Sequence, residues 1–389
     1  MIYFDNAAST QIHDDVLASM LPYLKEQYGN PSSLHRYGRL SRKAIEKARK
    51  QIASLINADP SEILITSGGT ESNNTVLQGV AMKNPSCQII TSSIEHDAIL
   101  EPCKKLSQNG FDVKYLPVDN FGMVSPADLA SKISENTGLV SIMFGNNEVG
   151  TIQPIAELAK ICNEYDIPFH TDAVQAVGKI PIDVKKLGID LMSISSHKLY
   201  GPKGIGALYI KNGISLDPVL LGGGQEHGMR SGTENVANIV GFGKACEIAK
   251  DNLHKNLVYV EKLQNSLINK IVDEIPQVVL NGHPQERLPS NAHFTFLGVN
   301  GEDLIIKLDE YGVAASTGSA CSVNTQKASH VLQAMGFSHE QITGSLRLTL
   351  GIFNNLNEIE QAVTALKKTV EELRSVSPFK EKYSFASKT

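Results

Sequence analysis

The stretches IPFHTDAVQ (residues 167–175) and LMSISSHK (residues 191–198) decide the fold of this chain. Each opens with the kind of short apolar run that is typical of a buried strand. Each then ends in polar residues, with Asp172 in the first stretch and Lys198 in the second. A lysine where a buried strand meets a turn must reach water or lose its proton, and a neutral amine is a nucleophile. The two stretches therefore predict an acid and an amine on neighbouring strand ends.

This pair matches the chemistry of pyridoxal phosphate (PLP). That cofactor needs a lysine that forms a Schiff base with its aldehyde and an acid that keeps its pyridine nitrogen protonated. Taken alone, an SHK string is more often a solvated surface lysine. The hypothesis therefore depends on Lys198 together with Asp172.

The sequence between about residues 60 and 210 alternates helical patterns with short strand-like runs. A segment such as 155–165 has apolar residues at helical spacing. Strands that alternate with helices in this way predict a mostly parallel sheet wrapped by helices, with ligands at the carboxyl ends of the strands. The seven expected strands are 63–66, 88–91, 113–116, 139–143, 167–170, 191–195 and 206–210.

A second, smaller α/β domain is expected after this sheet. Residues 235–272 have the pattern of one or two long helices, and an amphipathic helix carries Ile359, Val363, Leu366, Val370 and Leu373 on one face. Further apolar runs lie between these helices, at 292–297, 304–308 and 346–350. We expect residues 15–255 to form the large domain, and 1–14 with 256–389 to form the small one.

Composition limits the classes of function. The chain has 389 residues, 41% hydrophobic and 20% charged, with a formal net charge of −5. It has no basic stripe with interleaved aromatics, no signal-like N-terminus and no apolar run long enough to span a bilayer. We expect a cytosolic globular protein that acts on a small molecule and binds neither nucleic acid nor membrane.

Five cysteines, at positions 87, 103, 162, 246 and 321, are scattered without metal-ligand or disulfide-framework spacing. The sequence therefore predicts no metal site. Cys162 and Cys246 fall within helical patterns and are expected to be inert core residues. Cys321 differs, because the surrounding STGSACSVNT (316–325) is small and polar, which is typical of an exposed, mobile loop.

Three polar segments follow expected strands. TSGGTESNN (66–74), which includes Gly69 and Thr70, opens a helix and could cradle a phosphate with free backbone N–H groups. His96 could stack on a flat ring, and GNNEVG (145–150) offers carboxamides. Each feature also has an ordinary structural explanation as a cap or turn. Their coincidence at successive strand ends favours a PLP site.

Nine strings in the chain resemble the cysteine desulfurases of the NifS/IscS type, which are fold-type I PLP-dependent transferases in the class-V aminotransferase family. The resemblance extends from Tyr3 to about Leu373. The strings are FDNAAST, YGNPSSLHRYG, TSGGTESNN, EHDAIL, NNEVGTIQPI, HTDAVQAVGK, SSHKLYGPKGIGALY, GGGQEHGMRSGTENV and STGSACS. The resemblance implies conversion of L-cysteine to L-alanine, with the sulfur passed through an enzyme persulfide.

It also implies a set of residue roles. Lys198 would form the Schiff base, Asp172 would pair with the pyridine nitrogen, and His96 would stack on the ring and carry protons. Cys321 would accept the sulfur. The remaining roles are Gln175 for the phenolic oxygen; Gly69, Thr70, Ser195 and His197 for the phosphate; Thr233 for the phosphate of the neighbouring subunit in a homodimer; and Asn147 and Arg347 for the substrate carboxylate.

The sequence departs from the commonest family pattern at Ser196, where many members have glycine, and at residues 348–352, after Arg347. The string around Cys321 resembles the subgroup with a long cysteine loop, which favours direct transfer of sulfur to an iron–sulfur scaffold protein or another acceptor. Three alternatives stay open: a selenocysteine lyase or another class-V aminotransferase, a sulfur-relay hub with slow turnover of its own, and an α/β protein that binds no PLP.

Overall fold

A computed structural model describes residues 1–318 and 328–378 of the chain. Its centre is a seven-stranded sheet in the order β2-β8-β7-β6-β5-β3-β4. All strands run parallel except β8, which is antiparallel to both of its neighbours. The strands are β2 (Ile63–Thr66), β3 (Gln88–Ser92), β4 (Asp112–Leu116), β5 (Thr137–Ser141), β6 (Phe169–Asp172), β7 (Leu191–Ser195) and β8 (Gly206–Ile210). The mostly parallel seven-stranded sheet predicted from the sequence is confirmed.

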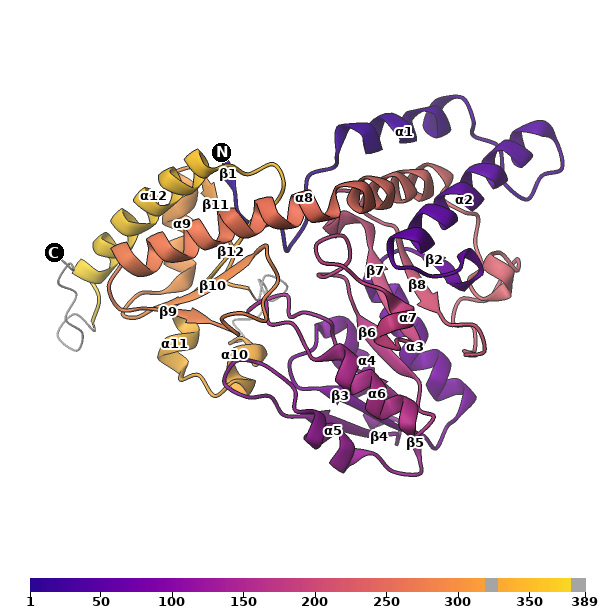
Figure 1. Cartoon of the computed structure of the whole chain (residues 1–389), viewed down its shortest axis with the longest axis horizontal. Helices are drawn as coiled ribbons and strands as arrows, with labels where there is room; N and C mark the ends of the chain where they lie inside the picture. The colour runs from indigo at the N-terminus through magenta and orange to yellow at the C-terminus, as the bar shows by residue number, and fades with distance from the viewer. Residues whose placement is uncertain (319–327, 379–389) are drawn as a thin grey trace.

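Helices cover both faces of this sheet (Figure 1). Because successive side chains of a strand point to opposite faces, Leu64 joins one apolar cluster and Ile65 the other. Ile89 and Ile90 divide in the same way. The helices of this part are α1 (Asp14–Lys25), α2 (Arg36–Leu55), α3 (Gly69–Lys83), α4 (Asp97–Gln108), α5 (Pro126–Lys132), α6 (Ile155–Glu164) and α7 (Val184–Leu187), with the short 3₁₀ turns η1 (Pro60–Glu62), η2 (Ser196–Lys198) and η3 (Glu226–Gly228).

The long helix α8 (Val236–Glu274) connects the two halves of the molecule, as Figure 1 shows. Its 39 residues span roughly 60 Å at 1.5 Å per residue. Phe242 and Ala245, near its start, pack into the core beside the large sheet. Leu263 and Leu267, nearer its end, pack into a separate apolar cluster. The sequence left one or two helices open here, and the structure has one.

The second half is built on the three-stranded antiparallel sheet β12-β10-β9. The N-terminal strand β1 joins this half by pairing in parallel with β11. The strands are β1 (Ile2–Tyr3), β9 (Val278–Asn281), β10 (Asn291–Phe296), β11 (Val313–Ala314) and β12 (Ser345–Thr349); the helices are α9 (Gly301–Glu310), α10 (His330–Ala334), α11 (His339–Thr343) and α12 (Leu356–Ser375). The apolar run 304–308 lies within α9, and the expected division of the domains near residue 255 stays a prediction.

No helix within residues 1–318 and 328–378 combines the length and apolar character that crossing a bilayer requires.

A buried ion pair fixes one edge of the large sheet. Arg49 of α2 donates to both carboxylate oxygens of Glu226 at 2.7 and 2.8 Å, and to the backbone oxygen of Ile63 at 2.7 Å. Glu226 also accepts from the backbone N–H of Ile65 at 2.9 Å. Both charged side chains are buried. The pair therefore ties α2, β2 and the segment before α8 to one another.

We predict that Arg49→Met lowers the free energy of unfolding by about 3 to 5 kcal/mol, because it leaves the Glu226 carboxylate buried without its partner. The double variant Arg49→Met/Glu226→Met should cost much less than the sum of the two single changes. Chemical denaturation measures this, with Lys114→Met at an exposed ion pair as the control, expected to cost below about 1 kcal/mol. A loss no larger than that of the control would contradict the prediction.

Candidate active site

Lys198 lies at the end of η2, directly after the buried strand β7. Its Nζ donates to the backbone oxygens of Ala7 at 2.5 Å and Ala8 at 2.9 Å. The turn that presents it is tight, because a Cβ at Gly201 would lie 2.0 Å from the Ser196 hydroxyl. The amine is therefore seated against the N-terminal segment rather than extended into bulk solvent.

Asp172 ends β6, the strand next to β7, and pairs in register with Ser193. Its Oδ2 accepts from the Asn73 side chain at 2.6 Å and its Oδ1 from the backbone N–H of Val174 at 3.0 Å. Because β6 and β7 are parallel, Asp172 and Lys198 lie at the same edge of the sheet. The structure thus places the predicted acid and amine on adjacent strand ends.

The predicted phosphate loop also lies at this edge. Gly69 begins α3, where a Cβ would come within 2.6 Å of the Val174 side chain and 3.9 Å of Ser195 Cβ. Gly69 therefore lets the loop approach the ends of β6 and β7. The first N–H groups of a helix, which here include that of Thr70, have no intrahelical acceptor and carry the positive end of the helix dipole.

His197 precedes the lysine, and its Nδ1 lies 3.2 Å from the Ser9 hydroxyl. Burial, together with the nearby charge of Lys198, lowers the pKa of His197 to about 4. At neutral pH the imidazole is therefore uncharged, and it can bind an oxygen through an N–H donor. Phosphate held here would rely on neutral donors and the helix dipole.

Gln175 lies three residues beyond Asp172 and is buried. Its side-chain Nε2 donates to the Ala7 oxygen at 2.9 Å, the same oxygen that Lys198 contacts. Its Oε1 accepts from Lys179 Nζ at 3.1 Å. No role was predicted for Lys179 from the sequence, although it stands inside one of the quoted strings.

Arg347 and Asn147, predicted to bind the substrate carboxylate, are in contact. The Arg347 guanidinium donates to the backbone oxygens of Asn147 at 2.8 Å and Gly318 at 3.3 Å. It also pairs with Asp5 at 2.9 Å. Its buried Nε has no hydrogen-bond partner among the described residues. A guanidinium held in this way suits the binding of a carboxylate.

His96 caps α4, and its Nδ1 accepts from the backbone N–H of Ala98 at 3.0 Å. Next to it, Glu95 is fully buried. Its Oε1 accepts from the Ser92 hydroxyl at 2.6 Å and from the backbone N–H of Met143 at 2.9 Å. Burial, reinforced by nearby Asp172, raises the pKa of Glu95 to about 8. The sequence analysis missed this carboxyl, although EH stands in a quoted string.

One predicted residue, Thr233, lies in a separate segment. Thr233 is exposed in the segment between η3 and α8, where neighbouring Arg230 pairs with Glu71 of α3 at 2.8 Å. Burial alone would raise the pKa of Glu71, but hydrogen bonds from Arg230 and Ser67 lower it below the usual value. This pair ties the Thr233 segment to the phosphate loop. Cys321, the predicted sulfur acceptor, lies outside the described residues.

The site fits PLP. It combines an amine, a carboxylate on the adjacent strand and a glycine-lined helix start. Lys198 would hold the aldehyde carbon and Asp172 the ring nitrogen. The other residues brought to this edge are Asn73, His96, Gln175, Ser195 and His197.

We predict that Glu95 makes the protein less stable as pH rises. Its pKa is 4.5 when unfolded and about 8 when folded, so between these values only the folded state binds the proton. The free energy of unfolding should therefore fall between about pH 5 and 8, by up to about 1.4 kcal/mol per pH unit. Glu95→Gln should flatten this slope, as measured by denaturation at each pH. The exposed control Glu101→Gln should leave it unchanged; equal slopes in the wild type and Glu95→Gln would contradict the prediction.

Comparisons with known proteins agree with this geometry. The family model "Aminotransferase class-V" matches residues 2–362. The cysteine desulfurase IscS of Dictyoglomus turgidum is 48% identical over 390 residues, which cover 100% of this chain and 99% of the relative.

Solved structures give the same result. A NifS-like protein superposes with a TM-score of 0.90 at 39% identity, covering 96% of this chain and 100% of its own. A structure described as SspA in complex with cysteine gives a TM-score of 0.82 at 38% identity, covering 91% and 100%. The resemblance inferred from the sequence motifs is confirmed: the chain belongs to the PLP-dependent class-V aminotransferase family and, within it, to the cysteine desulfurases.

Proposed function

We propose that the protein is a PLP-dependent cysteine desulfurase that converts L-cysteine to L-alanine and passes the sulfur through Cys321 to acceptor proteins. The observation that carries this proposal is the hydrogen bonding of the Lys198 amine to Ala7 and Ala8. Lys198 follows β7, the strand next to the one that ends in Asp172. It is supported by relatives named cysteine desulfurases that match the full chain, and by a similar structure described as a complex with cysteine.

In this proposal the chain holds the cofactor at several points. Lys198 binds its aldehyde carbon, Asp172 its ring nitrogen and Gln175 its phenolic oxygen, while His96 stacks on the ring. The phosphate is held by the α3 start at Gly69 and Thr70, with Ser195 and His197. When bound, PLP withdraws electrons from the α-carbon of an attached amino acid.

A second group of residues orients the substrate. Arg347 and Asn147 bind its carboxylate, and Asp5 and the Asn147 backbone keep the guanidinium in place. The Lys198 amine would remove the proton from the α-carbon of the bound amino acid. His96 carries a proton near the substrate thiol.

Cys321 then takes the sulfur. Its thiolate attacks the substrate sulfur, and an S–S bond forms as the C–S bond breaks. The carbon part takes up a proton at its β-carbon, recovers a proton at its α-carbon from Lys198, and leaves as L-alanine. The cysteines of the described residues do not suit this step, because all four are buried. Burial raises the pKa of Cys103 and of Cys162 to about 12, and also raises those of Cys87 and Cys246.

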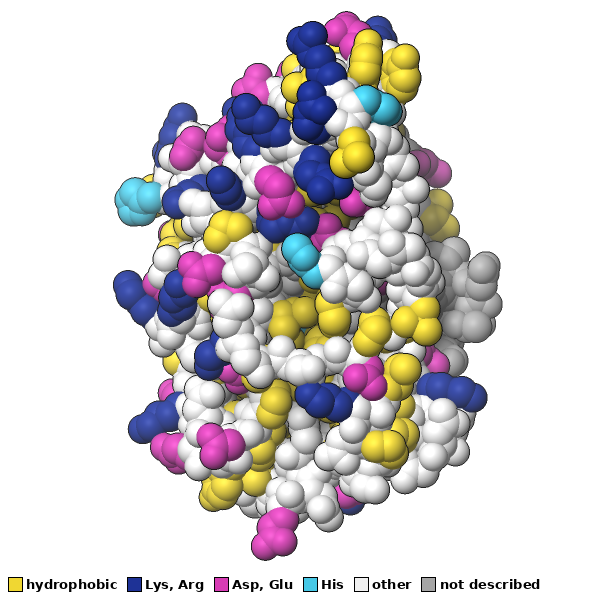
Figure 2. Space-filling view, turned by 90° about the vertical axis from the view of Figure 1, so that its right-hand side faces the viewer, with side chains coloured by type: hydrophobic (Ala, Val, Ile, Leu, Met, Phe, Trp, Pro, Cys, Tyr) yellow, Lys and Arg dark blue, Asp and Glu magenta, His cyan; other side chains and the backbone are white. Residues whose placement is uncertain are grey.

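We also propose a homodimer located in the cytosol. Figure 2 shows hydrophobic side chains at the surface among charged ones, on the side where α1 and α2 meet. Large apolar side chains are exposed in the connection between α1 and α2 and in the segment before α8. Their exposed fractions are 75% for Tyr28, 88% for Leu34 and 79% for Leu221. A second subunit that covers these residues would bring the exposed Thr233 of the first subunit towards the phosphate site of the second. An iron–sulfur scaffold or another protein would then receive the persulfide sulfur.

We predict that Lys198→Ala abolishes the visible absorbance of the covalently bound cofactor and lowers alanine formation by at least about 1,000-fold, because both the linkage and the base are lost. Absorbance spectra and an alanine assay measure these effects. Lys203→Ala, at an exposed position in the same segment, is the control that should retain both. A Lys198→Ala protein with full alanine formation would contradict the assignment.

We predict that Cys321→Ala keeps the visible absorbance but forms no persulfide from L-cysteine, since the accepting thiol is gone. Mass spectrometry of the cysteine-treated protein and sulfide release in the presence of a thiol reductant measure this. Ser322→Ala, at the next position, should behave like the wild type. Sulfide release by Cys321→Ala at the full wild-type rate would contradict the role of this residue. Parallel assays with selenocysteine separate a desulfurase from a selenocysteine lyase.

A further inference from the structure

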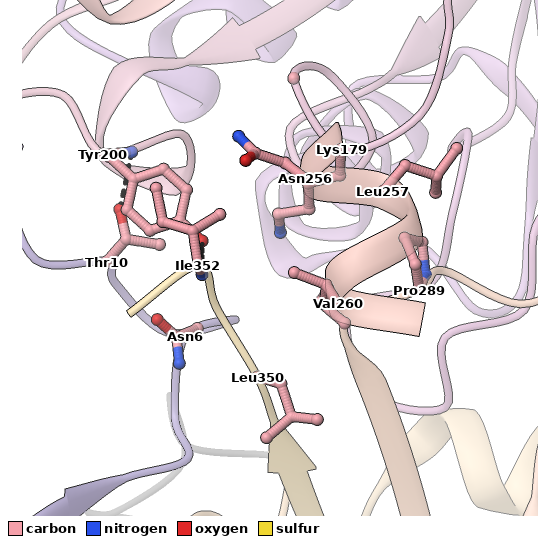
Figure 3. Close-up of a pocket in the computed structure, with 12 residues that line it drawn as sticks. Asn6, Thr10, Lys179, Tyr200, Asn256, Leu257, Val260, Pro289, Leu350 and Ile352 are labelled. Atoms are coloured by element: carbon pink, nitrogen blue, oxygen red, sulfur yellow. Dashed lines mark hydrogen bonds between the residues drawn. The ribbon is translucent and has the colours of Figure 1, made fainter. Parts of the chain in front are cut away.

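A small cavity lies where the two halves of the molecule meet (Figure 3). Thr10, Tyr200 and Ile352 line one side and Asn256, Leu257 and Val260 the other, as the close-up shows. Lys179 also lines this cavity, and none of the described residues around it contributes a carboxylate. The cavity has a volume of about 20 Å³, which is enough for about one water molecule. A lysine here needs a reason, because burying an amine without a carboxylate is costly.

The amine does have a polar partner. Lys179 Nζ donates to Gln175 Oε1 at 3.1 Å, and the other end of the same amide, Nε2, donates to the Ala7 oxygen at 2.9 Å. A carboxamide has one accepting and one donating end, and Lys179 in its protonated form can only donate. Turning the amide over would set its NH₂ against an ammonium and its oxygen against a carbonyl oxygen. Lys179 and Ala7 therefore fix which end of Gln175 faces each way.

This orientation matters on the side of Lys198. Lys198 Nζ also donates to the Ala7 oxygen, so the NH₂ end of Gln175 and the Schiff-base lysine converge on one atom. An amide NH₂ has two N–H groups, and one suffices for Ala7. The second can donate to an oxygen of a ring attached to Lys198. With the amide reversed, an oxygen would face the phenolic oxygen, and the contact would be repulsive.

We propose that Lys179 is a positioning residue that holds the Gln175 side chain with its NH₂ group towards the phenolic oxygen of PLP. The inference rests on the proposed placement of Gln175 against that oxygen. Lys179 itself acts only through Gln175. Its position beside the cavity leaves room for a larger group with the same donor capacity, such as a guanidinium.

The test uses the full-length protein, prepared without PLP and titrated with it. Lys179→Met removes the donor, Lys179→Arg keeps it, and Gln175→Met removes its target. Lys160→Met, on the exposed face of α6, is the matched control. The readouts are the dissociation constant for PLP, the wavelength of the visible absorbance maximum, and the thermal midpoint of the protein without PLP.

We expect Lys179→Met to bind PLP about three- to tenfold more weakly, which is the effect of one hydrogen bond of ordinary strength. The absorbance maximum should shift in the same direction as in Gln175→Met. Lys179→Arg should restore both values, and Lys160→Met should change neither. The thermal midpoint of Lys179→Met should not fall, because an apolar side chain replaces a buried amine. A purely structural lysine would lower that midpoint and leave the absorbance maximum in place.

The double variant Lys179→Met/Gln175→Met distinguishes the possible failures. If Lys179 acts through Gln175, the double variant should match Gln175→Met, so that the two effects are not additive. Additive effects, or a Lys179→Met spectrum identical to that of the wild type while Gln175→Met shifts, would overturn the inference and leave the proposed function intact. No shift in Gln175→Met would instead overturn the placement of Gln175. Should Lys179→Met fail to fold, Lys179→Leu removes the same donor.

Discussion

The backbone oxygen of Ala7 is the atom on which the arrangement of this site depends. It accepts hydrogen bonds from Lys198 and Gln175, which follow neighbouring strands of the large sheet, while the N–H of Ala7 donates to the Thr349 hydroxyl of β12. Two residues earlier, Asp5 pairs with Arg347 of the same strand. The N-terminal segment therefore joins the amine that would hold the cofactor to the guanidinium that would hold the substrate. A shift of this segment would change the spacing of both.

Burial determines the charge of several side chains around this N-terminal segment. It raises the pKa of Glu95 to about 8, so this acid favours its uncharged form at neutral pH, and it also raises the pKa of Glu148. Burial, together with the neighbouring charges of Lys198 and Arg347, lowers the pKa of Lys179 to about 7. The positive charges of Lys198 and Arg347 thus reach Lys179. Positive charge at this site suits ligands that bring a phosphate, a phenolic oxygen and a carboxylate.

Local sequence patterns were sufficient for the sheet and for the residues at its strand ends. Asp172 and Lys198 were predictable because each directly follows an apolar run, and parallel strands bring such ends together. The run 304–308 could not be assigned from its apolar residues, since a short run fits a strand or a buried helix. Its helix begins after the cap Asn300 and has acidic residues at 302 and 303. These are signals of a helix start that could have identified α9 from the sequence. Long-range contacts were not predictable: Ala7 and Lys198 are 191 positions apart, and Asp5 and Arg347 are 342 apart.

The way Lys198 is held is compatible with its covalent role. A lysine ammonium has three N–H donors, and the carbonyl groups of Ala7 and Ala8 accept two of them. Once Nζ is bound covalently, it has fewer hydrogens to donate. The segment does not depend on them, because Thr10 still bonds to the His197 oxygen at 3.0 Å and Ala7 still bonds to Thr349 at 2.9 Å. The lysine can therefore leave and return to its place while the segment that positions it stays fixed.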